Sequence, residues 1–123
     1  MPLRCLIVDD SRSFLTAARS LLELQGILVV AVCTTGAEAL VNTSSSHPDV
    51  AVVDVMLGHE SGVQLAQQLH AAGCAVVMTS THDMADIEEL LSGSPAVGFI
   101  AKSELSADAL HRVLNLPPAS GDA

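Results

Sequence analysis

Two adjacent acids, Asp9 and Asp10, stand directly after the first apolar run of this 123-residue sequence, and a third acid, Asp54, ends a later run. Carboxylates brought together repel each other, by about 4 kcal/mol for two unit charges ~4 Å apart at an effective dielectric constant of ~20. A divalent cation removes this repulsion, and an all-oxygen ligand set favours Mg²⁺ over Zn²⁺. The three acids therefore predict a magnesium site if the fold brings them together.

A hydroxyl and an ammonium group follow the same pattern. Thr79 and Ser80 end the fourth apolar run, and Lys102, the only lysine of the sequence, follows the fifth. With a metal ion present, the Asp54 carboxylate is suited to attack a phosphoryl group as a nucleophile. The Lys102 ammonium and the Ser80 hydroxyl would neutralise the remaining phosphoryl oxygens. These residue types predict a site that accepts a phosphoryl group through Mg²⁺.

Five short apolar runs, rich in Val and Ile, predict the strands that position these residues. The runs are continuous rather than alternating, which indicates strands that are buried on both faces. Their ranges are 3–8, 27–33, 49–54, 74–80 and 96–101. Polar residues that follow such runs would collect at one edge of a parallel sheet.

Helical patterns fill the segments between the runs. The first helix follows Ser11 and is closed by Gly26, the second covers 37–41 before the polar loop NTSSSHPD, and the third is closed by Gly73. The fourth rests on Ile87, Leu90 and Leu91, and the fifth on Leu105, Ala109, Leu110, Val113 and Leu114. Five strands that alternate with five helices predict an α/β fold.

The expected architecture is a flavodoxin-like, doubly wound, five-stranded parallel sheet of order 2-1-3-4-5, because crossover connections are right-handed. In such a fold the site lies beyond the carboxyl ends of the strands, at the switch point between strands 1 and 3. The acids at the ends of these two strands would meet there.

Composition excludes several classes of function. The formal net charge of -9 repels phosphate backbones, so we expect no direct nucleic-acid contact by this chain. No apolar run approaches the ~18–20 residues of a membrane span, and the N-terminus lacks the features of a signal peptide, so we expect a cytoplasmic protein without a membrane. The three cysteines have no ligand spacing and predict buried, reduced thiols, and the five histidines predict mostly surface positions, with His82 at the rim of a site.

Residues 3–115 resemble the receiver domains of bacterial two-component response regulators. Asp9 and Asp10 look like the acidic pair of that family. Three further segments look like its acceptor, hydroxyl and lysine segments, namely VVDVMLGHESG (52–62), VVMTSTHD (76–83) and VGFIAKS (97–103). Each motif alone is weak evidence for the resemblance, but four motifs in the right order at the expected strand ends are strong evidence.

The resemblance implies a role for each matching residue. Asp54 would be the phosphoacceptor, assisted by Lys102. The metal would lie on Asp9, Asp10, Asp54 and the backbone carbonyl of Met56. The switch would consist of the hydroxyl of Ser80 (Thr79 as the alternative) and the ring of Phe99, three residues before the lysine.

The resemblance also implies partners and an output. A sensor histidine kinase or a phosphotransfer protein would donate the phosphoryl group, and phosphorylation could produce a homodimer. The chain would not be an enzyme beyond self-catalysed phosphoryl transfer and autodephosphorylation. We expect a receiver domain at 1–116 and a linker or tail at 117–123, with an attached DNA-binding domain controlling transcription or, alternatively, a free-standing receiver that docks on a target protein.

Two positions depart from the family pattern, because Gly58 and Ser103 stand where prolines are common. Gly58 suggests a looser loop after the acceptor, and lysine followed by serine resembles receivers with a helix-turn-helix output domain. Two other classes fit less well. A haloacid-dehalogenase-like phosphatase needs a DxD nucleophile after strand 1, which DDS does not supply, and a flavin carrier of the flavodoxin type needs aromatic rings beside its cofactor.

Overall fold

The computed structural model describes residues 2–81 and 94–116 of the chain. The elements, in chain order, are β1 (Arg4–Val8), α1 (Arg12–Leu24), β2 (Leu28–Cys33), α2 (Gly36–Ser46), β3 (Val50–Asp54), β4 (Met56–Leu57), β5 (Glu60–Ser61), α3 (Gly62–Ala71), β6 (Ala75–Ser80), β7 (Gly98–Ala101), η1 (Lys102–Glu104) and α5 (Ala107–Val113). The predicted fourth helix and the predicted tail at 117–123 lie outside the described residues, as does His82.

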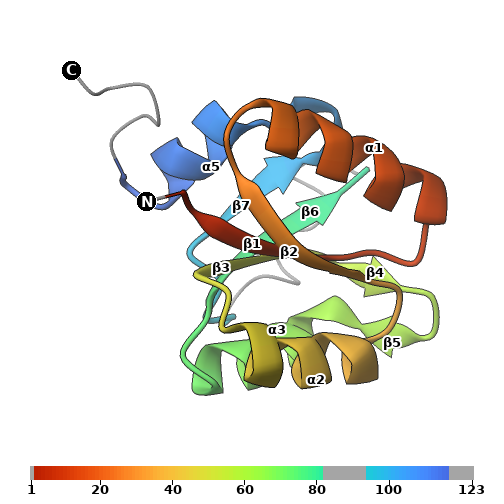
Figure 1. The fold of residues 1–123 in the computed structure, drawn as a ribbon. Helices are drawn as coiled ribbons and strands as arrows, with labels where there is room; N and C mark the ends of the chain where they lie inside the picture. Colours follow the sequence, from red (N-terminus) through yellow and green to blue (C-terminus); the bar gives the residue numbers. More distant parts are fainter. Residues whose placement is uncertain (1, 82–93, 117–123) are drawn as a thin grey trace.

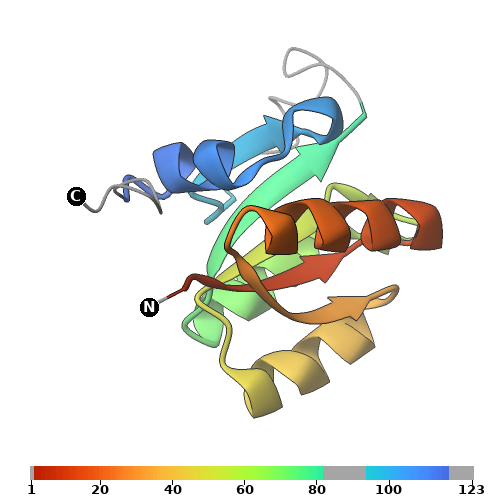
Figure 2. The same ribbon diagram turned by 45° about the horizontal axis from the view of Figure 1, so that its top comes forward.

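A five-stranded parallel sheet of order β2-β1-β3-β6-β7 forms the centre of the molecule (Figure 1). Counted along this sheet alone, the order is the predicted 2-1-3-4-5, so the flavodoxin-like topology is confirmed. Helices α1 and α5 cover one face of the sheet, and α2 and α3 cover the other (Figure 1). The described residues thus contain four of the five predicted helices. The turned view in Figure 2 shows the same layers with the twist of the sheet.

The core consists of two apolar clusters, one on each face of the sheet. Along β3 every residue is buried, as expected for a strand that is covered on both faces. One cluster joins alternate residues of the strands to α1 and α5, and the other joins the intervening residues to α2 and α3. Both aromatic side chains, Phe14 and Phe99, are only partly buried at the margins of these clusters, so the packing rests on aliphatic side chains.

Helix α1 begins where the sequence predicts, because Ser11 supplies its N-cap. The Ser11 hydroxyl accepts a hydrogen bond from the backbone N–H of Phe14, which satisfies one of the free donors of the first turn. Leu15, Ala18 and Leu22 form the buried stripe of this helix. The helix therefore lies on the sheet with its first turn above the ends of the strands.

Helix α2 is longer than expected, because it continues through Ser46 and does not end at residue 41. The polar residues of its second half form hydrogen bonds within the helix: Asn42 Nδ2 donates to the Glu38 carbonyl and the Ser45 hydroxyl donates to the Val41 carbonyl. Thr43 is buried against the sheet. Polar composition predicted a loop here, and these local bonds together with burial favour the helix.

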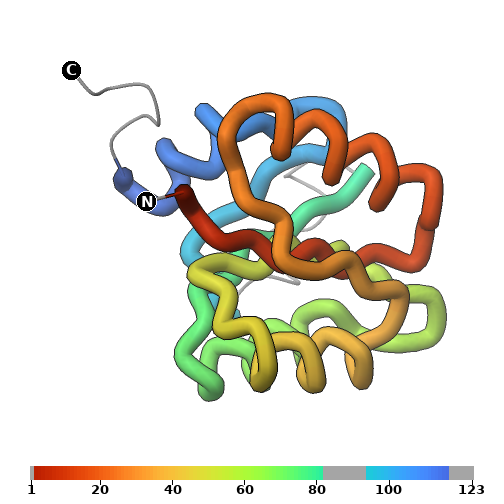
Figure 3. The backbone as a smooth tube through the Cα atoms, viewed as in Figure 1, coloured from red at the N-terminus to blue at the C-terminus, as the bar shows by residue number. Residues whose placement is uncertain are grey.

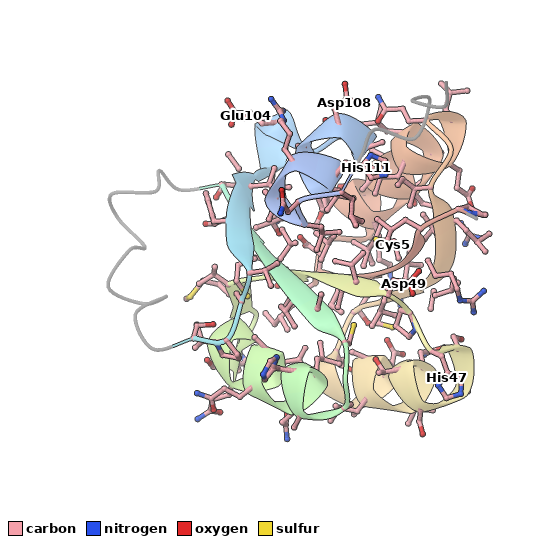
Figure 4. The ribbon with its side chains drawn as sticks, turned by 90° about the vertical axis from the view of Figure 1, so that its left-hand side faces the viewer. Cys5, His47, Asp49, Glu104, Asp108 and His111 are labelled. Atoms are coloured by element: carbon pink, nitrogen blue, oxygen red, sulfur yellow. The ribbon has the colours of Figure 1, made fainter. Side chains whose placement is uncertain are left out.

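One histidine also departs from the expectation. His111 is buried on α5, and its Nδ1 has no hydrogen-bond partner among the described residues. Figure 4 shows His111 beside the interior that contains Cys5, whereas His47 lies at the end of α2. The expectation for the cysteines is confirmed, because Cys5, Cys33 and Cys74 are free and buried.

The trace in Figure 3 shows that β1 begins on the same side of the molecule as the end of α5. The carboxyl ends of the strands therefore gather at the opposite edge, away from that junction. Within the described part of the chain, no helix is long and apolar enough to cross a membrane.

Candidate functional site

Three carboxylates meet at the carboxyl edge of the sheet. Strands β1 and β3 are neighbours in parallel register, with Val8 paired to Val53, so that the residues following each strand lie at the same level. Oxygen atoms of Asp9, Asp10 and Asp54 all lie within 4.8 Å of one another. Asp9 is completely buried, Asp54 is 7% exposed, and Asp10 faces solvent. The structure thus brings together the three acids that the sequence singled out.

Lys102 reaches this cluster from the end of β7. Its Nζ lies 2.6 Å from Asp9 Oδ2 and 3.1 Å from Asp54 Oδ2. Only 15% of the Lys102 side chain is exposed. A charge as deeply buried as Asp9 requires a partner, and the single lysine of the chain is that partner for two acids at once.

Each buried acid divides its two oxygens between a backbone donor and the lysine. Asp9 Oδ1 accepts a hydrogen bond of 2.8 Å from the N–H of Ser11, and Asp54 Oδ1 accepts one of 3.1 Å from the N–H of Met56. The Oδ2 atom of each acid faces Lys102. The two carboxylates are therefore fixed in orientation by the backbone turns that follow their strands.

The ionisation of the site reflects burial and charge together. Burial raises the pKa of the Asp54 carboxyl; the Met56 N–H and Lys102 act to lower this pKa, and the charge of Asp9 adds to the rise. Burial acts to lower the pKa of the Lys102 ammonium, but the hydrogen bonds and charges of Asp9 and Asp54 outweigh it and raise this pKa. The site thus favours the charged form of Lys102, while burial disfavours the charged form of Asp54.

The two candidate hydroxyls end β6 and are both buried. Thr79 pairs with Asp54 across the sheet, and its Oγ1 has no hydrogen-bond partner among the described residues. Ser80 lies one residue nearer the carboxyl edge and pairs with Ala101, the residue before Lys102. The register therefore places Ser80 at the level of the lysine.

Phe99 lies within β7, paired with Met78, and is half-buried. It lines a surface groove of about 450 Å³ together with Ile100, Val113 and other residues of β7 and α5. Met56 is 56% exposed, and its backbone N–H donates a hydrogen bond to Asp54 Oδ1. Ser103, at the proline position, lies exposed within η1.

The sequence did not single out Phe14 as a residue of the site. The ammonium of Lys102 lies 4.7 Å from the centroid of the Phe14 ring, a distance typical of a cation–π contact. The helical stripe of α1 indicated only a core position for this residue. The one available signal was its place in the first turn of the helix that follows Asp9 and Asp10.

The segment after Asp54 is a tight hairpin of β4 and β5, which the sequence did not predict. Gly58 has φ of +59°, as the first turn position of a type II′ hairpin requires. Proline, fixed near φ of about −65°, cannot adopt this conformation. The glycine therefore forms a tight turn, and a looser loop after the acceptor stays a prediction.

Gly62, the first residue of α3, closes this segment against the acceptor strand. A Cβ atom at this position would lie 1.9 Å from the Asp54 carbonyl oxygen, so no other residue fits without movement of the backbone. The Gly62 N–H donates to the carbonyl of Val55. This close approach fixes the backbone on both sides of Asp54.

The donor set fits Mg²⁺. Carboxylate oxygens are the hard ligands that this ion prefers, and the exposed Asp10 leaves room for the waters that it retains. Among the described residues the cation at these acids is Lys102, and its ion pairs are with Asp9 and Asp54 and not with Asp10. A divalent ion placed between the three oxygens would complete the charge balance of the cluster.

Fold and site together define an α/β protein with an acidic centre and one lysine at its switch point. The family model for the response regulator receiver domain matches residues 5–115. The chain belongs to this family. The match favours the receiver over the phosphatase and flavin-carrier alternatives.

Curated relatives agree with this assignment. The chain is 28% identical over 113 residues to the transcriptional regulatory protein DesR of Bacillus subtilis, covering 89% of this chain and 57% of the relative. It is 37% identical over 73 residues to the response regulator MprA of Mycolicibacterium vanbaalenii, covering 59% of this chain and 31% of the relative. The chain therefore spans about half, or less, of the length of these relatives.

Solved structures show the same fold. The receiver domain of a modulated diguanylate cyclase from Desulfovibrio desulfuricans superposes with a TM-score of 0.80 at 30% identity, covering 94% of this chain and 92% of that one. The receiver domain of the response regulator NarL from Mycobacterium tuberculosis gives a TM-score of 0.77 at 27% identity, covering 93% and 94%. Both are receiver domains by their titles, which supports the family assignment.

Proposed function

We propose that this receiver domain accepts a phosphoryl group on Asp54 in a reaction that requires Mg²⁺. The observation that carries this proposal is the convergence of Asp9, Asp10 and Asp54 within 4.8 Å, with Lys102 on the two buried acids. Bound Mg²⁺ would supply Lewis-acid stabilisation of the phosphoryl oxygens. Asp9, Asp10, Asp54 and the Met56 backbone carbonyl would hold it.

The Asp54 carboxylate is the nucleophile. The Met56 N–H holds its Oδ1, which leaves the Oδ2 side, now paired with Lys102, for attack on phosphorus. As the bond between the Asp54 oxygen and phosphorus forms, the bond between phosphorus and the phosphohistidine nitrogen of the donor breaks. That nitrogen keeps the electron pair. Lys102 then moves its charge from the carboxylate to a phosphoryl oxygen.

The donor is the phosphohistidine of a sensor histidine kinase or of a phosphotransfer protein. The chain itself acts as a signalling domain, and its only chemistry is self-catalysed phosphoryl transfer and autodephosphorylation. The acceptor oxygens lie beside the exposed Asp10, and this is the side from which a donor reaches Asp54. We place the domain in the cytoplasm.

The response begins at Ser80, with Thr79 as the alternative hydroxyl. Because Ser80 pairs with Ala101 beside Lys102, its movement toward a phosphoryl oxygen alters the packing of β6 against β7. Phe99 on β7 then changes position, and the surface of β7 and α5 changes with it. A homodimer formed on phosphorylation would use this changed surface.

The output belongs to a longer protein. We propose that residues 1–116 are the receiver, that 117–123 lead into a linker, and that a DNA-binding domain beyond it controls transcription. The name of DesR, a transcriptional regulatory protein, and the greater length of DesR and MprA support this version. A relative from Methanosarcina acetivorans is named as a protein-glutamate methylesterase, which would be a different output, and the reading frame beyond Ala123 tests the choice.

The acceptor assignment is tested by intact mass. The protein is incubated with Mg²⁺ and acetyl phosphate, and the fraction carrying one phosphoryl group is measured. Asp54→Asn should abolish the adduct, and chelation of the metal should abolish it in the wild type. Asp49→Asn, a change of the same type at the other end of β3, is the matched control and should leave the yield unchanged. An Asp54→Asn protein that forms the adduct at the wild-type yield would contradict the assignment.

A further inference from the structure

The hairpin of β4 and β5 forms one wall of the site. Its turn glycine, Gly58, lies so near Asp10 that a Cβ atom there would be 3.6 Å from Asp10 Oδ2. Its first residue, Met56, donates its N–H to Asp54 Oδ1. The position of the hairpin therefore decides how the backbone meets two of the three acids.

A hairpin this short does not hold itself in place. It contains only two residue pairs, Met56 with Ser61 and Leu57 with Glu60, and a two-stranded ribbon is marginally stable at best in water. The buried side chain of Leu57 holds one side of it in the core. Its other side requires a second attachment.

Glu60 provides this attachment. Its Oε1 accepts a hydrogen bond of 3.0 Å from the N–H of Gly36, the first residue of α2. A helix N-terminus favours a carboxylate because its free N–H groups carry partial positive charge. The Thr35 hydroxyl accepts a hydrogen bond from the N–H of Glu38, so Glu60 satisfies a separate donor of the same turn.

We propose that Glu60 is a positioning residue for the metal site, acting through the hairpin and making no contact with the metal or the phosphoryl group. This inference rests on the proposed function of Asp54. By tying the hairpin to α2, Glu60 holds Gly58 beside Asp10 and the Met56 backbone beside Asp54. Loss of the tie lets the hairpin move away from the acids and weakens Mg²⁺ binding.

The donor and the acceptor of the hydrogen bond between Gly36 and Glu60 can be changed independently. Glu60→Ala removes the acceptor, whereas Glu60→Gln removes the charge and keeps an oxygen that accepts from Gly36. Gly36→Ala leaves Glu60 intact but places a Cβ 2.7 Å from Glu60 Oε1, which displaces the carboxylate. Glu38→Ala is the matched control, because it removes an exposed acid from the same helix turn without touching the hairpin.

Mg²⁺ affinity is measured by calorimetric titration, the rate of adduct formation with acetyl phosphate by intact mass, and folding by circular dichroism. Glu60→Ala and Gly36→Ala should bind Mg²⁺ about three- to tenfold more weakly, the range expected for the net loss of one ordinary intramolecular hydrogen bond. Glu60→Gln and Glu38→Ala should stay within about twofold of the wild type. The weaker Mg²⁺ binding of Gly36→Ala should come without loss of helix stability, since alanine favours a helix.

Three results would overturn the inference. Wild-type affinity in Glu60→Ala or Gly36→Ala would show that the tie does not position the site. A Glu60→Gln protein as weak as Glu60→Ala would assign the effect to charge and not to the hydrogen bond. A wild-type protein that neither binds Mg²⁺ nor forms the adduct would remove the proposed function itself, and with it the role of Glu60.

Discussion

The ammonium of Lys102 lies 2.6 Å from the carboxylate of Asp9, closer than its 3.1 Å to Asp54. The lysine is therefore the counter-ion of a completely buried acid as well as a partner of the acceptor. One ammonium faces two of the three acids, so negative charge remains at the switch point for a divalent cation to neutralise. Several measurable consequences arise from this arrangement.

Replacement of Lys102 should destabilise the metal-free protein. Lys102→Met leaves Asp9 buried without a partner, and we expect the free energy of unfolding to fall by about 3 kcal/mol, the lower end of the range for removing one partner of a buried ion pair. Millimolar Mg²⁺ should restore part of this loss by neutralising the same acid. Urea denaturation with and without Mg²⁺ measures both effects.

Arg19→Met is the control for that experiment, because Arg19 forms a half-exposed pair with Glu23 and should cost less than about 0.5 kcal/mol. If Lys102→Met is as stable as Arg19→Met without metal, Lys102 is not the counter-ion of Asp9.

The contact between the Phe14 ring and the Lys102 ammonium should stabilise the folded protein. Phe14→Leu keeps an apolar side chain in the first turn of α1 but removes the aromatic face, and the expected cost is about 0.5–1 kcal/mol. The same substitution in a Lys102→Met background should cost clearly less, because the cation is gone. A double-mutant cycle by urea denaturation gives the coupling, and a coupling of zero would reject the cation–π contact.

Asp10 should be required for the stabilisation of the protein by Mg²⁺. Without bound metal, the same side chain should destabilise the protein. Asp10→Asn removes one of three crowded negative charges, so its melting temperature in chelator should exceed that of the wild type. Mg²⁺ at ~100 times its Kd should stabilise the wild type by about 2.7 kcal/mol and the variant hardly at all. Thermal melts decide the matter, and full Mg²⁺ stabilisation of Asp10→Asn would contradict the proposed ligand set.

The buried thiols predict a loss of stability at alkaline pH. Burial raises the pKa of Cys5 to about 12 and the pKa values of Cys33 and Cys74 to about 11, from an ordinary value of 9.0. Above that ordinary value the unfolded chain releases thiol protons that the folded chain retains, so stability falls as pH rises toward these raised values. Urea denaturation across this range measures the loss.

Cys5→Ala is the matched variant, since it removes the thiol with the highest pKa from the centre of the core. It should lose less stability than the wild type between about pH 9 and pH 11. An identical pH dependence in the two proteins would show that Cys5 does not contribute to the alkaline loss.

The sheet and the charged residues at its edge could be predicted because they depend on local signals. Continuous apolar runs marked the strands, and the residue types directly after them marked Asp9, Asp10, Asp54 and Lys102. Parallel topology then required those ends to meet. Burial of the strands in the structure follows the same pattern.

Other features depend on contacts between distant parts of the chain. The hairpin after Asp54 is attached by Glu60 to α2, and Phe14 meets Lys102 from the opposite end of the sequence. Neither pairing has a local signature. The second half of α2 was missed for a different reason, because Asn42, Thr43 and Ser45 favour loops in general and here bond within the helix or are buried.

The most direct test of the account is the chemical location of the phosphoryl group. After incubation with Mg²⁺ and acetyl phosphate, borohydride reduces an aspartyl phosphate to homoserine, and peptide mass spectrometry identifies the modified position. The account predicts homoserine at position 54, only in the presence of Mg²⁺ and absent from Asp54→Asn. Homoserine at position 9, 10 or 49, or a stable phosphoserine at position 80 with position 54 unmodified, would contradict it.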